Sequence, residues 1–318
     1  MQIFRCPACA ARVYFHNAAC GCGQAVRFDP DAQAMRAEGP VCANRDEIGC
    51  NWLAETEGWC RSCRMTRIVP DLRAPENRPL WEKTELAKRW VLACLARWGW
   101  FVVSDPGPRP SFRLLSERTA AGDHDVVMGH AGGEITLNVS EAHEATRAAR
   151  QEGLGEIYRT MVGHIRHEIA HFLFLRLSVD AAFLSGFRAL FGDERADYAA
   201  ALQAHYAAPK PAGAWHVTSY ATAHPHEDWA ETIAHLLHLT DLLDCAAAAG
   251  LALPDGPPPG YDAYAEPDTD ALISRAVDLA IAVTHVNRGL DLPDLYPFVL
   301  TRGVRDKIGF AHAQLRRA

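Results

Sequence analysis

The chain has 318 residues and a formal net charge of −7, with 49% hydrophobic and 22% charged residues. This length favours two globular domains with a sizeable core, and the acidic balance disfavours nucleic acid or an anionic membrane surface as the main partner. No apolar run is long enough to span a bilayer, and no signal-peptide pattern precedes Cys6. We therefore expect a cytoplasmic protein with no membrane partner.

Eight of the ten cysteines lie in the first fifth of the chain. In a reducing compartment such a cluster favours metal binding over disulfides. Two C-x-x-C pairs have the spacing of zinc knuckles, and the segment has too few large apolar residues to fold as a core of free thiols. We predict a small zinc-ribbon domain over residues 1–75 that holds two structural zinc ions. The expected ligands are Cys6, Cys9, Cys20 and Cys22 at the first site, and Cys42, Cys50, Cys60 and Cys63 at the second.

The charge of this segment indicates the kind of partner that it suits. Arg61, Arg64 and Arg67 surround the last cysteine pair, but the segment through residue 75 has nine arginines against eight acidic residues. This balance is not the footprint of a site for a phosphate backbone, so contact with a protein through the zinc ribbon is favoured. Residues 70–79 contain three prolines and are expected to form a linker without a helix.

The elements after the linker belong to a second predicted domain at residues 76–318. Apolar spacing predicts a helix over residues 84–98. A short element starts at Phe112, and residues 125–130 and 134–139 are predicted strands joined by an Ala-Gly-Gly hairpin turn. The second of these strands suits either the edge of a sheet, where an extended peptide can pair with it, or the interior of the sheet.

Residues 163–172 contain the H-E-x-x-H pattern of the zincin metallopeptidases. In a helix, predicted here over residues 155–177, His167 and His171 lie one turn apart on the same face and can bind one zinc ion. Glu168 then stands beside the metal, where a water molecule would sit. The apolar side chains repeat on an adjacent stripe of this helix, which leaves the histidine face for a cleft.

A catalytic zinc site needs a third protein ligand and leaves the fourth position to water. The remaining candidates lie in a helix predicted from Pro225 toward Gly250. Glu227 and Glu231 share one face of it, so one carboxylate can bind zinc while the other accepts a hydrogen bond from a zinc-bound histidine. Asp228 is a weaker alternative, because it points a quarter turn away.

An H-E-x-x-H motif followed by a helix with Glu-x-x-x-Glu resembles the gluzincin arrangement, and in particular the catalytic domain of anthrax lethal factor. The resemblance implies that Glu227 is the third ligand of a catalytic zinc and that Glu231 orients a ligating histidine. A catalytic tyrosine stands seven residues before the zinc-binding glutamate in that domain, and Tyr220 stands seven before Glu227 here. The resemblance therefore implies that Tyr220 donates a hydrogen bond to the transition state.

Further motifs are spread along the chain: Cys-Ala-Asn at 42–44, Cys-Asn-Trp at 50–52, Cys-Arg-Ser-Cys-Arg at 60–64, Tyr-Arg-Thr at 158–160, Phe-Gly-Asp-Glu-Arg at 191–195 and His-Pro-x-Glu-Asp-Trp-Ala-Glu-Thr at 224–232. Together they resemble the bacterial zinc-binding metallopeptidases that carry an N-terminal zinc ribbon. This resemblance covers almost the whole chain. It implies an α+β fold, in which a mainly helical, zincin-like metallopeptidase domain with a small sheet follows a small zinc-ribbon domain.

The residues and the resemblance together predict zinc-dependent hydrolysis of peptide bonds in a peptide or protein substrate. The prediction requires one catalytic zinc ion besides the two structural ones. A zinc-activated water attacks the scissile carbonyl, and Glu168 acts as general base and then as general acid. The competing hypothesis is a non-catalytic module whose zinc ribbon and zincin fold bind a peptide or protein.

Overall fold

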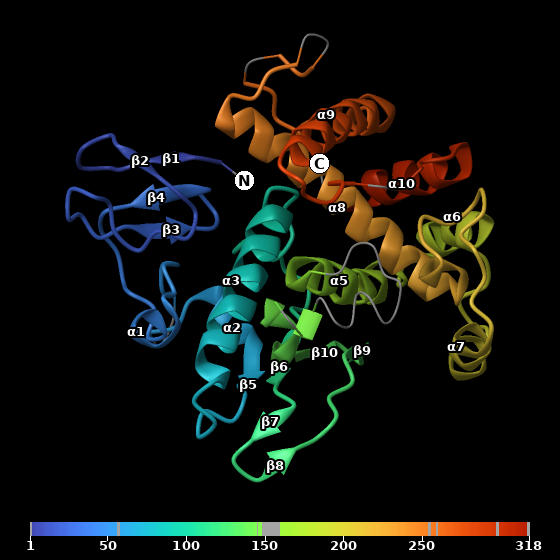
Figure 1. The fold of residues 1–318 in the computed structure, drawn as a ribbon, viewed down its shortest axis with the longest axis horizontal. Coiled ribbons are helices and arrows are strands. Elements are labelled where there is room, and N and C mark those ends of the chain that lie inside the picture. The colour runs from blue at the N-terminus through green and yellow to red at the C-terminus, as the bar shows by residue number, and fades with distance from the viewer. Residues whose placement is uncertain are drawn as a thin grey trace. The chain divides into compact units, whose positions relative to one another are not determined.

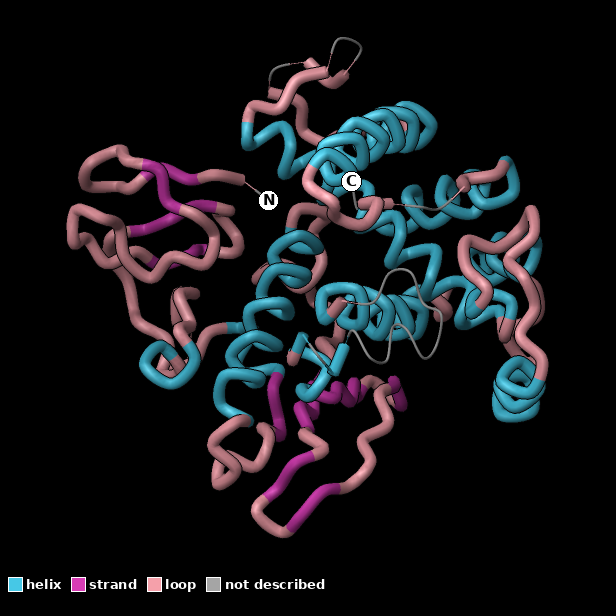
Figure 2. The backbone as a smooth tube through the Cα atoms, in the orientation of Figure 1, coloured by secondary structure: helices cyan, strands magenta, loops and turns pink. Residues whose placement is uncertain are grey.

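The structure is a computed structural model and describes residues 2–55, 58–144, 146–147, 160–253, 256–258, 260–296 and 299–316. The chain divides into two compact units, Met1–Ile165 and Arg166–Ala318. The strands belong to the first unit, whereas the described part of the second contains helices and loops (Figure 2). The predicted α+β class is confirmed. Within the described ranges, no helix is both long and apolar enough to cross a membrane.

The N-terminal part of the first unit consists of short hairpins and helices around an aromatic centre. Phe28 is fully buried, and its ring lies 4.8 Å from that of Phe15 and 5.6 Å from that of Trp52. Such short elements bury little backbone, so side-chain contacts and metal ligation must hold them together. The elements are β1 (Phe4–Arg5), β2 (Arg12–Val13), β3 (Arg27–Asp29), β4 (Ala34–Arg36), α1 (Arg45–Ile48) and α2 (Arg61–Met65).

A four-stranded sheet follows, with the strand order β5-β6-β10-β9. β10 runs parallel to β6 and antiparallel to β9, so it is an interior strand, and the edge positions belong to β5 and β9. The predicted hairpin is confirmed, but residues 125–128 form no strand, and Val127 is 83% exposed. The bounds are β5 (Thr66–Ile68), β6 (Ser111–Leu115), β9 (Gly129–Ala131) and β10 (Glu134–Asn138), beside a separate hairpin of β7 (Arg118–Thr119) and β8 (Gly122–Asp123) and a short 3₁₀ helix at Val139–Ala142.

The long helix of the first unit is α3 (Asn77–Ala96). It begins inside the predicted linker, so the expectation of a linker without a helix is wrong at residues 77–79. Pro79 is the third residue of α3, where a backbone N–H has no partner within the helix, and proline therefore costs no hydrogen bond there. The first strand of the sheet, β5, precedes α3 and pairs with β6.

The helix that carries the H-E-x-x-H motif is α5 (Met161–Leu177). Its end agrees with the prediction, and the predicted first turn lies outside the described residues. Thr160 precedes it and accepts a hydrogen bond from the backbone N–H of Gly163 through its hydroxyl, at 3.0 Å, as expected of a helix start. The boundary between the two compact units falls within this helix.

The second unit is organised around α8, which contacts α9 and α10 along its length (Figure 1). Both predicted ends of α8 are confirmed: Pro225 is its first residue, and Gly250 ends it in the left-handed conformation. Two further helices, α6 and α7, were not among the predicted elements. The bounds are α6 (Ala181–Phe191), α7 (Tyr198–Ala207), a 3₁₀ turn η2 (Tyr220–Thr222), α8 (Pro225–Ala249), α9 (Thr269–Gly289) and α10 (Arg302–Leu315).

Candidate metal centres

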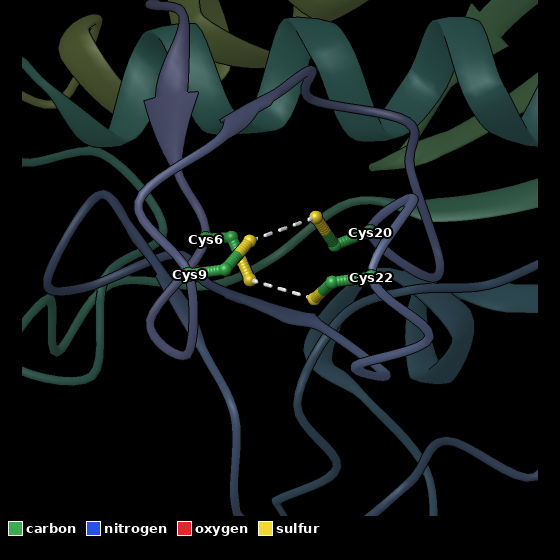
Figure 3. A group of neighbouring side chains, drawn as sticks. All are labelled: Cys6, Cys9, Cys20 and Cys22. Carbon is green, nitrogen blue, oxygen red and sulfur yellow. Dashed lines mark hydrogen bonds between the residues drawn. The ribbon is translucent and has the colours of Figure 1, made fainter.

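The first predicted cysteine group comes together in the structure (Figure 3). Cys6 and Cys22 have their Sγ atoms 3.9 Å apart, and those of Cys9 and Cys20 are 3.6 Å apart. Four thiolates at about 2.3 Å from a tetrahedral zinc ion lie roughly 3.8 Å from one another. A disulfide would require a separation of about 2.05 Å. The spacing therefore fits zinc ligation.

The second group, Cys42, Cys50, Cys60 and Cys63, also gathers its sulfurs, and all four residues are buried. The Sγ atom of Cys50 lies 3.6 Å from that of Cys60 and 3.8 Å from that of Cys63. The Sγ of Cys60 accepts a hydrogen bond from the backbone N–H of Cys63 at 3.4 Å, as is typical of a zinc knuckle.

Arg89 on α3 supports the presence of a charged metal centre at this second group. It is fully buried, and its guanidinium nitrogens have no hydrogen-bond partner in the described structure. Burial lowers the pKa of Arg89, but the nearby charges of Cys50 and Glu85 raise it above its ordinary value. A zinc ion with four thiolates carries two net negative charges, and such a centre compensates a buried guanidinium.

The third group lies in the second unit and joins His167 and His171 on α5 to Glu227 on α8. The two histidine Nε2 atoms are 3.2 Å apart. Glu227 brings Oε2 to 3.0 Å from Nε2 of His167 and Oε1 to 3.5 Å from Nε2 of His171. Nitrogen and oxygen ligands at about 2.0–2.1 Å from a tetrahedral zinc ion lie roughly 3.3 Å apart, so this donor set fits zinc.

The two helices are held at this spacing by contacts on the side of α8 away from the metal ligands. Trp229 is fully buried and donates its indole N–H to the backbone carbonyl of Ala170 on α5, at 2.9 Å. Phe183 and Phe187 of α6 pack against the same indole at ring distances of 5.4 and 5.9 Å. This packing places Glu227, near the N-terminus of α8, opposite the histidines.

Glu231 determines which nitrogen of His167 can bind a metal. Its Oε1 atom lies 2.8 Å from Nδ1 of His167, and a carboxylate can only accept a hydrogen bond, so Nδ1 carries the proton. The lone pair of Nε2 is then directed toward the other ligand atoms. Thr218 donates its hydroxyl to Oε2 of Glu231 at 2.8 Å and holds the carboxylate in place.

The electrostatic environment of this group favours a cation. Burial lowers the pKa of His167, but the carboxylates of Glu227 and Glu231 outweigh this effect and raise it well above its ordinary value. Burial raises the pKa of Glu227, but the two histidines lower it well below its ordinary value, so the carboxylate is ionised. Two ionised carboxylates around one imidazole stabilise positive charge, whether a proton or a metal ion supplies it.

The remaining predicted residues are placed as follows. Glu168 is buried on α5 next to His167. Tyr220, in η2, has its ring 5.9 Å from that of His167. Burial and the charge of Glu227 raise the pKa of its phenol, so it stays protonated and can donate a hydrogen bond. Asp228, the weaker alternative ligand, is buried elsewhere and forms an ion pair with Lys307 of α10.

Two side chains near the site had no signal in the sequence. Tyr198, the first residue of α7, donates its hydroxyl to Oε1 of Glu227 at 2.6 Å. The ring of His226 lies 6.4 Å from that of His171. Tyr198 comes from a helix that the sequence did not predict. His226 lies one residue after the predicted start of α8, and the sequence assigned no role to it.

Comparison with known proteins identifies the family. A family described as "Putative zinc-binding metallo-peptidase" matches residues 77–314 of the chain. A zinc-ribbon domain family matches residues 3–41. The chain therefore belongs to this metallopeptidase family and has an N-terminal zinc ribbon, as the resemblance implied. Zinc binding is supported by the family and by the two four-cysteine groups.

Relatives of similar length exist in mycobacteria. The uncharacterized proteins Rv2568c of Mycobacterium tuberculosis (strain ATCC 25618 / H37Rv) and Mb2598c of Mycobacterium bovis are each 38% identical to this chain over 332 residues. The alignment covers 98% of this chain and 94% of each relative. No solved structure matches the chain.

Proposed function

We propose that this protein is a zinc metallopeptidase that hydrolyses peptide bonds in a peptide or protein substrate. The observation that carries the proposal is the convergence of His167, His171 and Glu227, whose ligand atoms lie 3.0 to 3.5 Å apart. These three ligands leave one position of a tetrahedral zinc ion for water or substrate, which distinguishes a catalytic site from a structural one. The four-cysteine groups complete two further zinc sites without an open position.

Within this proposal the chain's own residues bind, orient and move protons. Zinc, when bound, supplies a Lewis acid that polarises the scissile carbonyl and lowers the pKa of water. Glu168, which follows the first histidine ligand, accepts the proton of the attacking water and delivers it to the leaving amine. Glu231 keeps the proton of His167 on Nδ1 throughout, because its carboxylate only accepts hydrogen bonds.

Tyr220 is the proposed donor to the oxyanion that develops on the substrate carbonyl. Its protonated phenol and its position beside the His167 ring support this role. One donor of this kind contributes about 2.7–4 kcal/mol to stabilisation of a transition state. The proposal also includes contact with another protein through the zinc ribbon. It further includes a cytoplasmic location, because thiolate clusters stay reduced there.

The test is Glu168→Gln, compared with the wild type on a library of denatured proteome peptides whose new termini are read by mass spectrometry. We expect the variant to keep its zinc content and to lose at least about 100-fold in cleavage, because the proton acceptor is absent. Glu82→Gln, at an exposed position of α3, is the matched control and should cleave as the wild type does.

Two outcomes would contradict the proposal. Undiminished cleavage by the zinc-loaded Glu168→Gln protein would exclude the proton-transfer role. A wild type that holds only two zinc ions, with none lost on His167→Ala, would favour the non-catalytic binding module instead. Three zinc ions in the wild type and two in His167→Ala are expected.

A further inference from the structure

α7 (Tyr198–Ala207) is unusual among the helices of the second unit because none of its residues is buried. Helices in proteins are stabilised chiefly by packing of an apolar face, and this one has little such packing. Contacts of single side chains must therefore account for much of its position, among them those of the His205 and Tyr206 rings with the ring of Tyr220, at 5.8 and 6.5 Å. The principal one is the hydrogen bond from the Tyr198 hydroxyl to Oε1 of Glu227, at 2.6 Å.

The backbone in front of Tyr198 is fixed to the start of α8. His224, the N-cap of α8, accepts a hydrogen bond from the backbone N–H of His226 through Nδ1, at 3.1 Å. Its Nε2 therefore carries a proton, which it donates to the carbonyl of Ala196 at 3.1 Å. The ring of Tyr198 also packs against that of His224, with centroids 5.2 Å apart.

The two oxygens of Glu227 consequently have different surroundings. Oε2 faces Nε2 of His167 at 3.0 Å, whereas Oε1 accepts the hydrogen bond of Tyr198 and lies 3.5 Å from Nε2 of His171. Glu227 is only 1% exposed, so solvent does not satisfy its carboxylate, and the loss of a donor would leave a buried charge poorly compensated. Partial burial of the Tyr198 phenol and the charge of Glu227 raise its pKa, so it remains a donor.

We propose that Tyr198 is a positioning residue that fixes the carboxylate of Glu227 for metal binding, and that it thereby links α7 to the occupancy of the metal site. The inference rests on the metal site of the proposed function. Its role differs from that of Tyr220, which is proposed to contact the substrate. A hydrogen bond to Oε1 would fix the orientation of the carboxylate toward the two histidines, as the outer partners of metal ligands do.

The first measurement is the affinity for Zn²⁺, obtained by competition with a chromophoric chelator. Tyr198→Phe removes only the hydroxyl, and we expect zinc binding at the His167 site to weaken by about 10–100-fold, as is usual when a partner of a ligand is lost. Saturating zinc should restore three ions per chain, and the two cysteine sites should keep their affinity. Tyr14→Phe, in the first unit and 55% exposed, is the control with unchanged affinity at the His167 site.

The second measurement is hydrogen exchange of residues 198–207. Zinc loading of the wild type should slow exchange there, and Tyr198→Phe should abolish that difference. A variant with wild-type zinc affinity, or one whose α7 is protected equally by zinc, would overturn the inference. If instead the wild type itself binds no zinc that depends on His167, the proposed function fails, and the two failures are thus distinguishable.

Discussion

The imidazole of His167 has two ring nitrogens, and the neighbours of each one decide what it can bind. Glu231 holds the proton on Nδ1, and Thr218 in turn holds Glu231, at 2.8 Å in both contacts. His167, Glu231 and Thr218 thus form one hydrogen-bonded series on the side of the imidazole away from Glu227. The spacing of Glu227 and Glu231 on one helix predicts that one of the two carboxylates accepts a hydrogen bond from a histidine, and the resemblance to the gluzincins assigns this role to Glu231. Thr218 lies in a loop with no periodicity, so only the folded structure reveals it.

For this hydrogen-bonded series we predict that Glu231→Gln weakens zinc binding at the His167 site by about 10–100-fold, because a neutral amide orients the imidazole less strongly. Chelator competition measures the affinity. Glu266→Gln is the control: its side chain is 14% exposed, close to the 18% of Glu231, and it pairs with Arg275 rather than with a metal ligand. Equal affinities of wild type and Glu231→Gln would contradict the assigned role.

The helices α5 and α8 form the candidate site because Trp229 packs them together while Glu227 faces the two histidines. Motif spacing and helix-end signals predict α8 correctly, from Pro225 to the residue before Gly250. Other predicted elements are wrong for local reasons. Pro79 does not prevent a helix, since it occupies the first turn of α3, and the Val126-Val127 pair does not form a strand, since no neighbour pairs with it in the described sheet.

For the pair of site helices we predict that Trp229→Phe lowers the free energy of unfolding by about 1–3 kcal/mol. The change removes the hydrogen bond to the carbonyl of Ala170 and leaves a cavity among the rings of α6. Urea unfolding followed by circular dichroism measures it. Trp215→Phe, at a position 61% exposed, should stay within about 0.5 kcal/mol of the wild type. Similar values for both variants would show that Trp229 does not hold the helices together.

Across the molecule as a whole, the two four-cysteine groups differ in exposure. Cys9 and Cys22 of the first group are exposed, whereas all four cysteines of the second are buried. A chelator reaches an exposed thiolate site without unfolding, but a buried one only through local opening, whose free energy slows release. The two structural sites should therefore exchange zinc at different rates.

We predict that a His167→Ala protein, which keeps only the cysteine sites, releases zinc to excess EDTA in a fast and a slow phase. Adding Cys9→Ser should remove the fast phase and leave the slow one, as read with a metallochromic indicator. Cys245→Ser, outside both groups, is the control and should preserve both phases. A single phase of release, or a fast phase that survives Cys9→Ser, would refute this assignment.

Local sequence patterns are enough to predict which side chains the structure brings together in the three candidate metal groups, because metal ligation demands particular side chains at short, regular spacings. The cysteine pairs, the two histidines one turn apart and the two glutamates one turn apart are all patterns of this kind. The H-E-x-x-H motif therefore locates two of the three members of the third group, His167 and His171, from spacing alone.

The surroundings of those ligands depend instead on tertiary packing. Tyr198 reaches Glu227 across 29 residues, and Arg89 lies buried beside a cysteine group that begins 47 residues earlier. Such contacts leave no periodic trace in the sequence, because they depend on how separate elements pack rather than on the spacing within one element. Packing thus determines how the carboxylate of Glu227 lies between the two histidines and which of its oxygens accepts the tyrosine hydroxyl.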